Sequence, residues 1–121
     1  MGNPVVWVEL SVQDMSRAKT FYEAVLGRPL DPVPMPDAEM AMFRGEEGYG
    51  SSGALFKMAG VPSGGNSTLV YFTCEDCAVE AGRVAAAGGR IFREKFAIGE
   101  HGFCALAFDT EGNMFGLHSM K

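Results

Sequence analysis

The stretch VVWVELSVQDMSRAKTFYEAVLGR, residues 5–28, decides the fold, because the sequence contains a second version of it. The later version is STLVYFTCEDCAVEAGRVAAAGGR, residues 67–90, and it aligns without a gap at an offset of 62 residues. In each version, a run rich in β-branched and aromatic residues ends at an aspartate, Asp14 or Asp76, that can cap a helix. The helical segment ends at glycine, and further strands follow. The sequence therefore predicts one strand–helix–strands module used twice.

Hydrophobic periodicity predicts the individual elements. The first module is expected to hold a strand at 4–12, a proline-rich edge strand and loop at 29–41, strands at 39–43 and 53–58, and a helix that buries Met15, Ala18, Phe21 or Tyr22, and Val25. The second is expected to hold a strand at 68–74, a helix at 77–87 and strands at 90–98, 102–108 and 113–119. In DTEGN, residues 109–113, Gly-Asn predicts a tight hairpin with positive backbone angles. One domain is expected, with modules at about 4–58 and 68–121 and a linker at 59–67.

Composition limits the class of protein. A chain of 121 residues with 47% hydrophobic residues fits one soluble globular domain, and a net charge of −5 argues against nucleic acid as a partner. The sequence has no membrane-spanning run and no basic-then-apolar leader, so we expect no membrane association and a cytoplasmic location. The three cysteines fit a reducing compartment, and Cys74 and Cys77, although spaced as CxxC, are interpreted as structural thiols rather than a redox or zinc site.

The segments SVQDMSRAKTFYEAVLGR and AFDTEGNMFGL resemble the vicinal oxygen chelate superfamily, and the resemblance covers essentially the whole chain. Glyoxalase I, extradiol dioxygenases, fosfomycin-resistance proteins and bleomycin-binding proteins belong to this superfamily. The resemblance implies an α+β fold in which two βαβββ modules form a cup-shaped, curved mixed sheet, with a homodimer as the usual assembly. Because one such fold hosts several chemistries, function has to be argued from the site.

In the metal-dependent members of the superfamily, a histidine on the first strand of each module and a glutamate on the last strand bind a divalent ion. By motif position these ligands fall on Trp7, Leu69 and Gly116, none of which can bind a metal. The metal-dependent members take a further ligand from the fourth strand. The corresponding segment here, SGALFKM, residues 52–58, offers no carboxylate or imidazole. A catalytic metal needs about three protein donors, so we expect neither a metal nor another cofactor.

Three residues are weak candidates for catalysis. Glu9 shares a strand face with Trp7, which the resemblance places inside the cup, and a desolvated carboxylate can act as a base. His118 faces the same way as Gly116, and a hairpin that pairs residue 106 with 116 would set Cys104 opposite His118 as a thiol–imidazole pair. The plainer interpretations are a hydrogen-bonded strut for Glu9, a surface or packing role for His118, and a small buried apolar residue for Cys104.

Strand alternation predicts an apolar and aromatic cup lining that suits a flat organic molecule. The expected ligand-binding residues are Trp7, as principal contact, Glu9, Leu69, Tyr71, Met114 and His118, with Phe108, Phe43, Phe56 and Met58 as weaker candidates. The alternative is that these side chains fill the cup and admit no ligand.

Three functions remain open at this point. The first is a metal-free protein that sequesters or senses a small aromatic or cationic molecule. The second is a glyoxalase-like lyase or isomerase, or a dioxygenase-related enzyme, with a non-standard site. The third is a structural or partner-binding dimer.

Overall fold

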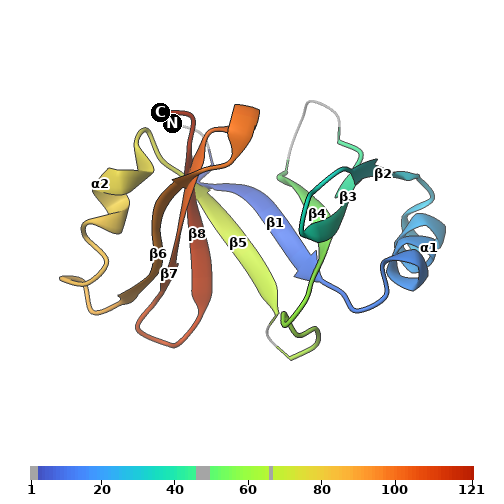
Figure 1. The fold of residues 1–121 in the computed structure, drawn as a ribbon, viewed down its shortest axis with the longest axis horizontal. Helices are drawn as coiled ribbons and strands as arrows, with labels where there is room; N and C mark the ends of the chain where they lie inside the picture. The colour runs from blue at the N-terminus through green and yellow to red at the C-terminus, as the bar shows by residue number, and fades with distance from the viewer. Residues whose placement is uncertain (1–2, 46–49, 66) are drawn as a thin grey trace. The chain divides into compact units, whose positions relative to one another are not determined.

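The computed structural model describes residues 3–45, 50–65 and 67–121, and it contains the two predicted modules (Figure 1). The order of elements is β1 (Val5–Ser11), α1 (Met15–Leu26), β2 (Leu30–Val33), β3 (Ala38–Phe43), β4 (Ser52–Met58), β5 (Thr68–Thr73), α2 (Cys77–Ala81), β6 (Arg90–Ala97), the 3-10 turn η1 (Gly99–His101), β7 (Phe103–Phe108) and β8 (Met114–Ser119). The prediction of an α+β fold with two βαβββ modules is confirmed. Asn66, in the predicted linker, lies outside the described residues.

The chain forms two compact units. The N-terminal unit is Trp7–Thr68, and the C-terminal unit is Leu69–Lys121 together with the segment that ends at Val6. That segment belongs with the C-terminal unit because the amide of Thr73 donates to the carbonyl of Pro4 at 2.8 Å. Neither helix in the described part of the chain is long and apolar enough to cross a bilayer.

The N-terminal unit is a four-stranded mixed sheet, in the order β2-β3-β4-β1, with α1 against one face (Figure 1). β1 runs parallel to β4, and the other neighbours are antiparallel. Its core consists of buried Leu30, Ala41 and Leu55 with side chains of β1, α1 and β3 packed against them, including Leu10 and Tyr22. Since strand residues alternate between faces, Trp7, Glu9 and Ser11 lie on the face away from α1, as predicted. We call this face the N-terminal open face.

Helix α1 begins and ends where the sequence predicted. The Asp14 carboxylate accepts a hydrogen bond from the amide of Arg17 at 3.0 Å, and Gly27 closes the helix with φ 67°. Met15, Ala18 and Tyr22 pack on the core. Of the two alternatives Phe21 and Tyr22, the buried one is Tyr22, and Phe21 is 58% exposed. The prediction that Val25 is buried is wrong, because Val25 is 62% exposed. Phe21 precedes Tyr22 and so points about 100° away from it around the helix.

The C-terminal unit repeats the arrangement, in the order β5-β8-β7-β6 with β5 parallel to β8. Its core contains Cys77 and Ala81 from α2 and Ala105 and Leu117 from the sheet, with Phe72, Cys74, Ile91, Phe103 and Phe115 packed against them. The residues that alternate with these form the face away from α2, which we call the C-terminal open face.

Helix α2 is shorter than predicted. It ends at Ala81 rather than near residue 87, and Gly82 follows at the cap position. Glycine is a poor helix former, and the next hydrogen bonds, from Arg83 to Glu80 and from Val84 to Ala81, reach back three residues as in a 3-10 turn.

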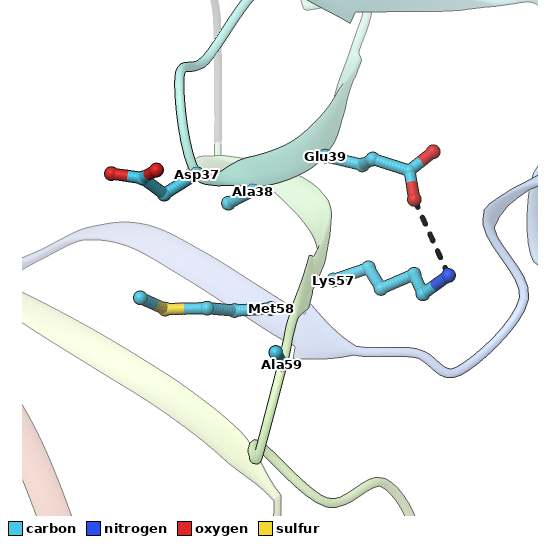
Figure 2. A pocket seen from close by; sticks show the side chains of 6 residues that line it. All are labelled: Asp37, Ala38, Glu39, Lys57, Met58 and Ala59. Atoms are coloured by element: carbon cyan, nitrogen blue, oxygen red, sulfur yellow. Dashed lines mark ion pairs between the residues drawn. The ribbon is translucent and has the colours of Figure 1, made fainter.

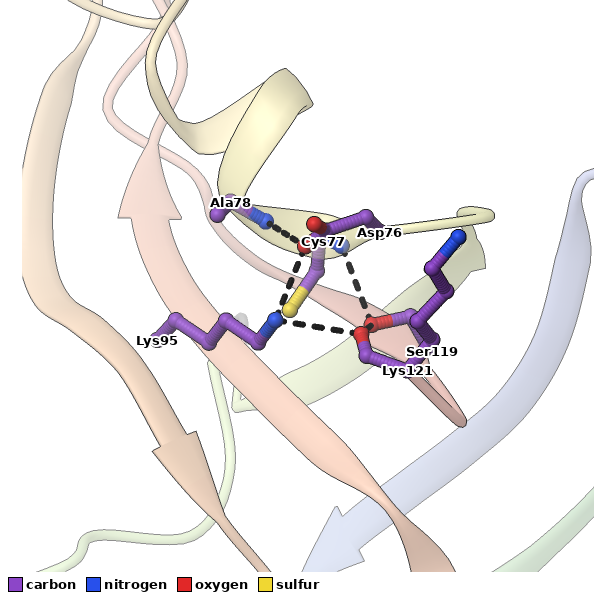
Figure 3. Close-up of polar contacts among 6 residues, drawn as sticks. All are labelled: Asp76, Cys77, Ala78, Lys95, Ser119 and Lys121. Atoms are coloured by element: carbon purple, nitrogen blue, oxygen red, sulfur yellow. Dashed lines mark hydrogen bonds and ion pairs between the residues drawn. The ribbon is translucent and has the colours of Figure 1, made fainter.

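A polar network ties the start of α2 to β6 and to the segment after β8 (Figure 3). The Asp76 carboxylate accepts from the amide of Ala78 at 3.0 Å and from Lys95 Nζ at 2.9 Å. Ser119 Oγ accepts from the amide of Cys77 at 3.0 Å and donates to the carbonyl of Lys121 at 2.9 Å. Lys95 Nζ also donates to that carbonyl, at 3.1 Å. These bonds hold the five-residue helix in place although it is too short to be stable alone.

The β7–β8 hairpin has the predicted register, with Leu106 opposite Gly116. Only Gly112 takes a positive angle, φ 83°, so the expectation of a second one at Asn113 is wrong. The Asp109 carboxylate stabilises the turn instead, accepting from the amides of Glu111 and Asn113 at 2.8 and 2.9 Å. Hydrogen bonds from Asn113 lower the pKa of the Asp109 carboxyl below its ordinary 3.8.

Candidate functional site

Trp7 and Glu9 form a hydrogen-bonded pair on the N-terminal open face. The indole Nε1–H of Trp7 donates to Glu9 Oε2 at 3.0 Å, and both residues are half-buried. In the sheet register, Glu9 lies beside the fully buried Ala54, whose neighbour on β3 is Met42. The pair thus presents an aromatic ring and a carboxylate fixed against small and apolar neighbours. Phe43, a weaker lining candidate, is misassigned, because it packs in the core on the α1 side.

The C-terminal open face brings together the other four predicted ligand residues. Along β5 and β8 the register places Tyr71 beside Gly116, so Leu69 and Met114, two residues earlier on each strand, share that face, and His118 lies two residues later. The neighbouring strand β7 adds Cys104, Leu106 and Phe108, which pair with His118, Gly116 and Met114. The face is a sheet surface of apolar and aromatic side chains with one imidazole.

The ring of Tyr71 covers Gly116. A β-carbon at position 116 would clash with the ring atoms Cγ, Cδ2 and Cε2 of Tyr71. Gly116 stands where the superfamily motif carries its glutamate ligand, so this chain has replaced a donor and filled its place with an aromatic ring. Trp7 and Leu69, at the two histidine positions, also lack a metal donor. The residues present therefore do not fit a divalent metal of the superfamily type.

The candidate catalytic residues Cys104 and His118 lie opposite each other on β7 and β8, as the hairpin predicted. His118 Nε2 lies 2.6 Å from the carbonyl oxygen of His101. A carbonyl only accepts, so Nε2 carries the proton and, in the neutral ring, Nδ1 is the free acceptor. Cys104 is buried, with 5% exposure, and His101 is exposed in η1. The site therefore contains an oriented imidazole next to a buried thiol.

The other two cysteines are poor candidates for chemistry. Cys77 is fully buried in the core of the C-terminal unit. Burial, followed by a hydrogen bond to Glu80, raises the pKa of the Cys74 thiol to about 12, so it stays protonated at neutral pH. Within residues 3–45, 50–65 and 67–121, no three His, Cys, Asp or Glu side chains are clustered closely enough to hold a metal ion.

Two surface hollows each border one of the weaker lining candidates from the sequence, Met58 or Phe108. A shallow hollow of about 240 Å³ lies at the ends of β3 and β4, and Figure 2 shows its Glu39–Lys57 ion pair, 3.4 Å long, on the opposite side of these strands from Asp37 and Met58. The other, about 330 Å³, lies between the turns after α2 and the β7–β8 hairpin and is lined by Arg83, Val84, Ala87, Phe115 and others. Met58 is a weaker lining candidate from the sequence, and it borders the first hollow while remaining 43% exposed.

Sequence reasoning missed two basic residues of the C-terminal open face, Arg90 and Arg93 on β6. The register pairs Arg90 with Phe108 and Arg93 with Leu106, which share a face on β7. Residues three apart face opposite ways in a regular strand, so simple alternation would place Arg90 and Arg93 on opposite faces of the sheet. The available signal was the spacing of large side chains in RIFREKF, residues 90–96, where Arg90, Arg93 and Phe96 recur at every third position.

The paired βαβββ modules and their open faces define the structural class, and comparisons with known proteins agree with it. Residues 5–46 match the family model of the bleomycin resistance protein-like N-terminal domain. Two mycobacterial proteins, each named "Putative glyoxylase CFP32", from Mycobacterium bovis and Mycobacterium tuberculosis, are 28% identical in an alignment of 120 residues that covers 92% of this chain. The chain spans 43% of the length of these relatives.

Solved structures share the fold at low sequence identity. A Streptomyces coelicolor methylmalonyl-CoA epimerase variant in complex with 2-nitronate-propionyl-CoA is 16% identical, with a TM-score of 0.70 and 95% of each chain covered. A Mycobacterium tuberculosis methylmalonyl-CoA epimerase is 15% identical, with a TM-score of 0.68 over 94% of this chain and 85% of its own. A hypothetical protein from Bacillus halodurans, 13% identical with a TM-score of 0.70, covers 97% of this chain and 94% of its own. Together these matches indicate the vicinal oxygen chelate superfamily, which confirms the resemblance found in the sequence.

Proposed function

We propose that this chain is a metal-free small-molecule-binding protein that sequesters or senses a flat aromatic or cationic ligand on its open sheet faces. The observation that carries the proposal is the Trp7–Glu9 hydrogen bond of 3.0 Å. It fixes an indole ring and a carboxylate on one strand face before any ligand arrives, which reduces the entropy cost of binding. An aromatic face attracts a flat ring or a cation, and a carboxylate adds attraction for positive charge.

The loss of metal donors supports a binding role over metal-dependent catalysis. Trp7, Leu69 and Gly116 replace the three ligands of the superfamily motif, and the Tyr71 ring covers Gly116. We infer that Leu69, Tyr71, Met114 and His118 contribute ligand contacts from the C-terminal open face. Side chains that are apolar or aromatic, with few polar points, are typical of sites for small organic molecules.

The test uses the fluorescence of Trp7, which is the only tryptophan in the sequence. Aromatic and cationic compounds are screened for saturable quenching or a spectral shift, and each hit is then measured by calorimetry. We expect Trp7→Ala to weaken binding of aromatic hits, and Glu9→Gln to weaken binding of cationic hits by a few-fold to tenfold. Val79→Ala is the control, because Val79 is an exposed apolar residue on α2. Hits that bind folded Trp7→Ala and Glu9→Gln as tightly as wild type would contradict the proposal.

A glyoxalase-like enzyme with a non-standard site is the second candidate, and the observation that favours it is the oriented His118. Its Nε2 is held by the His101 carbonyl, so Nδ1 can accept a proton beside Cys104. The relatives named as glyoxylases and the epimerase structures make two substrates worth testing, the methylglyoxal–glutathione hemithioacetal and methylmalonyl-CoA. Turnover of either that falls at least 100-fold in His118→Ala, in a metal-free buffer, would establish the enzyme and overturn a pure binding role.

We also propose a homodimer in a reducing, cytoplasmic setting, with residues 1–121 as one domain. Support for the reducing setting comes from Cys74, Cys77 and Cys104, which form no disulfide in the described part of the chain. Exposed large apolar side chains support self-association, among them Phe21 and Val25 on α1 and Phe92 on β6. A structural or partner-binding dimer remains the third candidate function, and it predicts that no small molecule binds.

A further inference from the structure

We propose that Arg90 and Arg93 form an anion-binding pair that holds the carboxylate or phosphate of an organic ligand lying on the C-terminal open face. This inference rests on the proposed small-molecule function and adds the charge of the group that this unit recognises.

Two irregularities in β6 create the pair. The register runs Arg90–Phe108, Ile91–Ala107, Arg93–Leu106 and Phe96–Cys104, with a shift between Ile91 and Arg93 and another between Arg93 and Phe96. Each shift inserts one residue in β6 relative to β7. As a result Arg90, Arg93 and Phe96 lie opposite Phe108, Leu106 and Cys104, which are successive residues of one face of β7. Such bulges commonly redirect side chains next to functional sites.

Aromatic stacking fixes the two guanidinium groups. Arg90 Cζ lies 4.4 Å from the centre of the Phe108 ring, and Arg93 Cζ lies 3.7 Å from the centre of the Phe96 ring. A guanidinium that lies over a ring is held by the attraction between its charge and the ring face, which does not use up its N–H donors. Both groups are therefore positioned before a ligand binds.

Neither guanidinium is neutralised by a carboxylate of the described residues. The ion pairs involve Arg44, Lys57, Lys95 and His101 but not Arg90 or Arg93. Glu94, which follows Arg93, is exposed, and Asp109, which follows the register partner of Arg90, has oxygens that accept from Glu111 and Asn113 in the hairpin turn. In a chain of net charge −5, two arginines on one face with no ion pair to any described residue give that face a local positive charge.

The surface next to the arginines is apolar and aromatic. The sheet row that starts at Arg93 continues through Leu106 and Gly116 to Tyr71, and the row that starts at Arg90 continues through Phe108 to Met114. Phe92 is 58% exposed and packs edge-on to Phe108 with ring centres 5.8 Å apart. A ligand that fits has a flat apolar body and an anionic end, because arginine forks bind planar carboxylate and phosphate groups through paired hydrogen bonds.

The experiment is calorimetric titration at neutral pH and low salt with 2-naphthoate, 2-naphthyl phosphate and the neutral control 2-naphthamide. Wild type is compared with Arg90→Gln, Arg93→Gln and Arg93→Lys, and with Arg17→Gln, which removes the same charge from an exposed site on α1. We expect both glutamine variants to weaken binding of the anions about tenfold, the loss typical of one charge-assisted hydrogen-bonding pair, and Arg93→Lys to weaken it less. The tighter of the two anions identifies the group.

Three results would overturn the inference: no saturable binding of either anion at millimolar concentration, equal affinity for the amide, or an equal loss in Arg17→Gln. Thermal unfolding of each variant checks that the fold is intact. Failure here is distinguishable from failure of the proposed function, since ligands that quench Trp7 fluorescence would still bind the arginine variants. If neither set of compounds binds, both proposals are wrong.

Discussion

At the scale of single residues, aromatic rings occupy positions where the superfamily motif carries metal ligands. Trp7 takes the place of the first histidine, and Tyr71 lies over Gly116 at the glutamate position. The indole of Trp7 then uses its one donor on Glu9. Ring contacts therefore take the place of metal donors at these two positions, which supports the proposed binding of organic molecules by packing rather than through a metal.

The close approach of Tyr71 to Gly116 makes a specific prediction about stability. We expect Gly116→Ala to destabilise the protein by about 1–3 kcal/mol, because the added methyl group clashes with the Tyr71 ring and overpacks the site. In a Tyr71→Ala background the same substitution should cost much less, since the ring is gone. Urea unfolding of the four proteins measures this coupling. An identical cost of Gly116→Ala in both backgrounds would show that the ring does not fill this space.

At the scale of elements, the irregular backbone of β6 determines which side chains lie on the C-terminal open face. The bulges in β6 bring Arg90, Arg93 and Phe96 to one face. The polar network at Asp76, Lys95 and Ser119 holds the short α2 against the opposite side of the same sheet (Figure 3). The proposed anion-binding pair therefore depends on an edge strand that departs from regular alternation.

The ion pair between Asp76 and Lys95 at the start of α2 predicts that the stability of the protein depends on pH. The hydrogen bond from Lys95, followed by that from the amide of Ala78, lowers the pKa of the Asp76 carboxyl below its ordinary 3.8. Since the folded pKa lies below the unfolded one, this carboxylate stabilises the protein above about pH 3.8, and the contribution is lost as pH falls through the folded value. We expect Asp76→Asn to be less stable than wild type at pH 7 and the difference to shrink at pH 3, measured by urea unfolding.

The control for that experiment is Asp14→Asn, which changes the cap of α1 in the same way, at a residue with no ion pair to a lysine in the described part of the chain. It separates the effect of an asparagine cap from that of a lost ion pair. A wild-type advantage over Asp76→Asn that stays the same size from pH 7 to pH 3 would contradict the account.

Sequence reasoning predicted the elements whose signals are local. The Asp14 cap, the Gly27 closure and the Asp109–Asn113 turn specify α1 and the β7–β8 register, and through that register the position of Cys104 opposite His118. It failed for Phe43, which packs in the α1 core, because long-range packing decides there, and it overlooked the local signal of Gly82, which follows the last residue of α2. The bulges of β6 could not be predicted by alternation, because an inserted residue is defined only by the partner strand.

At the scale of the whole molecule, two units built on one pattern carry different chemistry. The N-terminal open face presents a ring and a carboxylate at Trp7 and Glu9, whereas the C-terminal open face presents an imidazole and two guanidinium groups. Duplication of a module followed by divergence of its exposed faces would account for this difference. Some core positions meanwhile correspond: Leu10 and Phe72, Val12 and Cys74, and Met15 and Cys77 are 62 residues apart and pack in the cores of the two units.

The proposed homodimer should form through faces rather than strand edges. The edge strand β2 has four residues and contains Pro32, and the edge strand β6 is irregular at two points, features that discourage edge pairing. We expect sedimentation equilibrium at micromolar concentration to give twice the chain mass of 13.0 kDa, and Phe21→Asp or Phe92→Asp to shift the protein toward monomer. A wild-type mass of 13.0 kDa under these conditions would exclude the dimer.

The most direct test of metal-free binding is one fluorescence titration done twice. Protein dialysed against EDTA is titrated with the best ligand from the Trp7 screen, and the titration is repeated after zinc, nickel or iron is supplied. The account predicts saturable binding with the same dissociation constant in every case and no stoichiometric metal after dialysis. Binding that appears only when a metal is present, or about one metal ion per chain retained through dialysis, would contradict it.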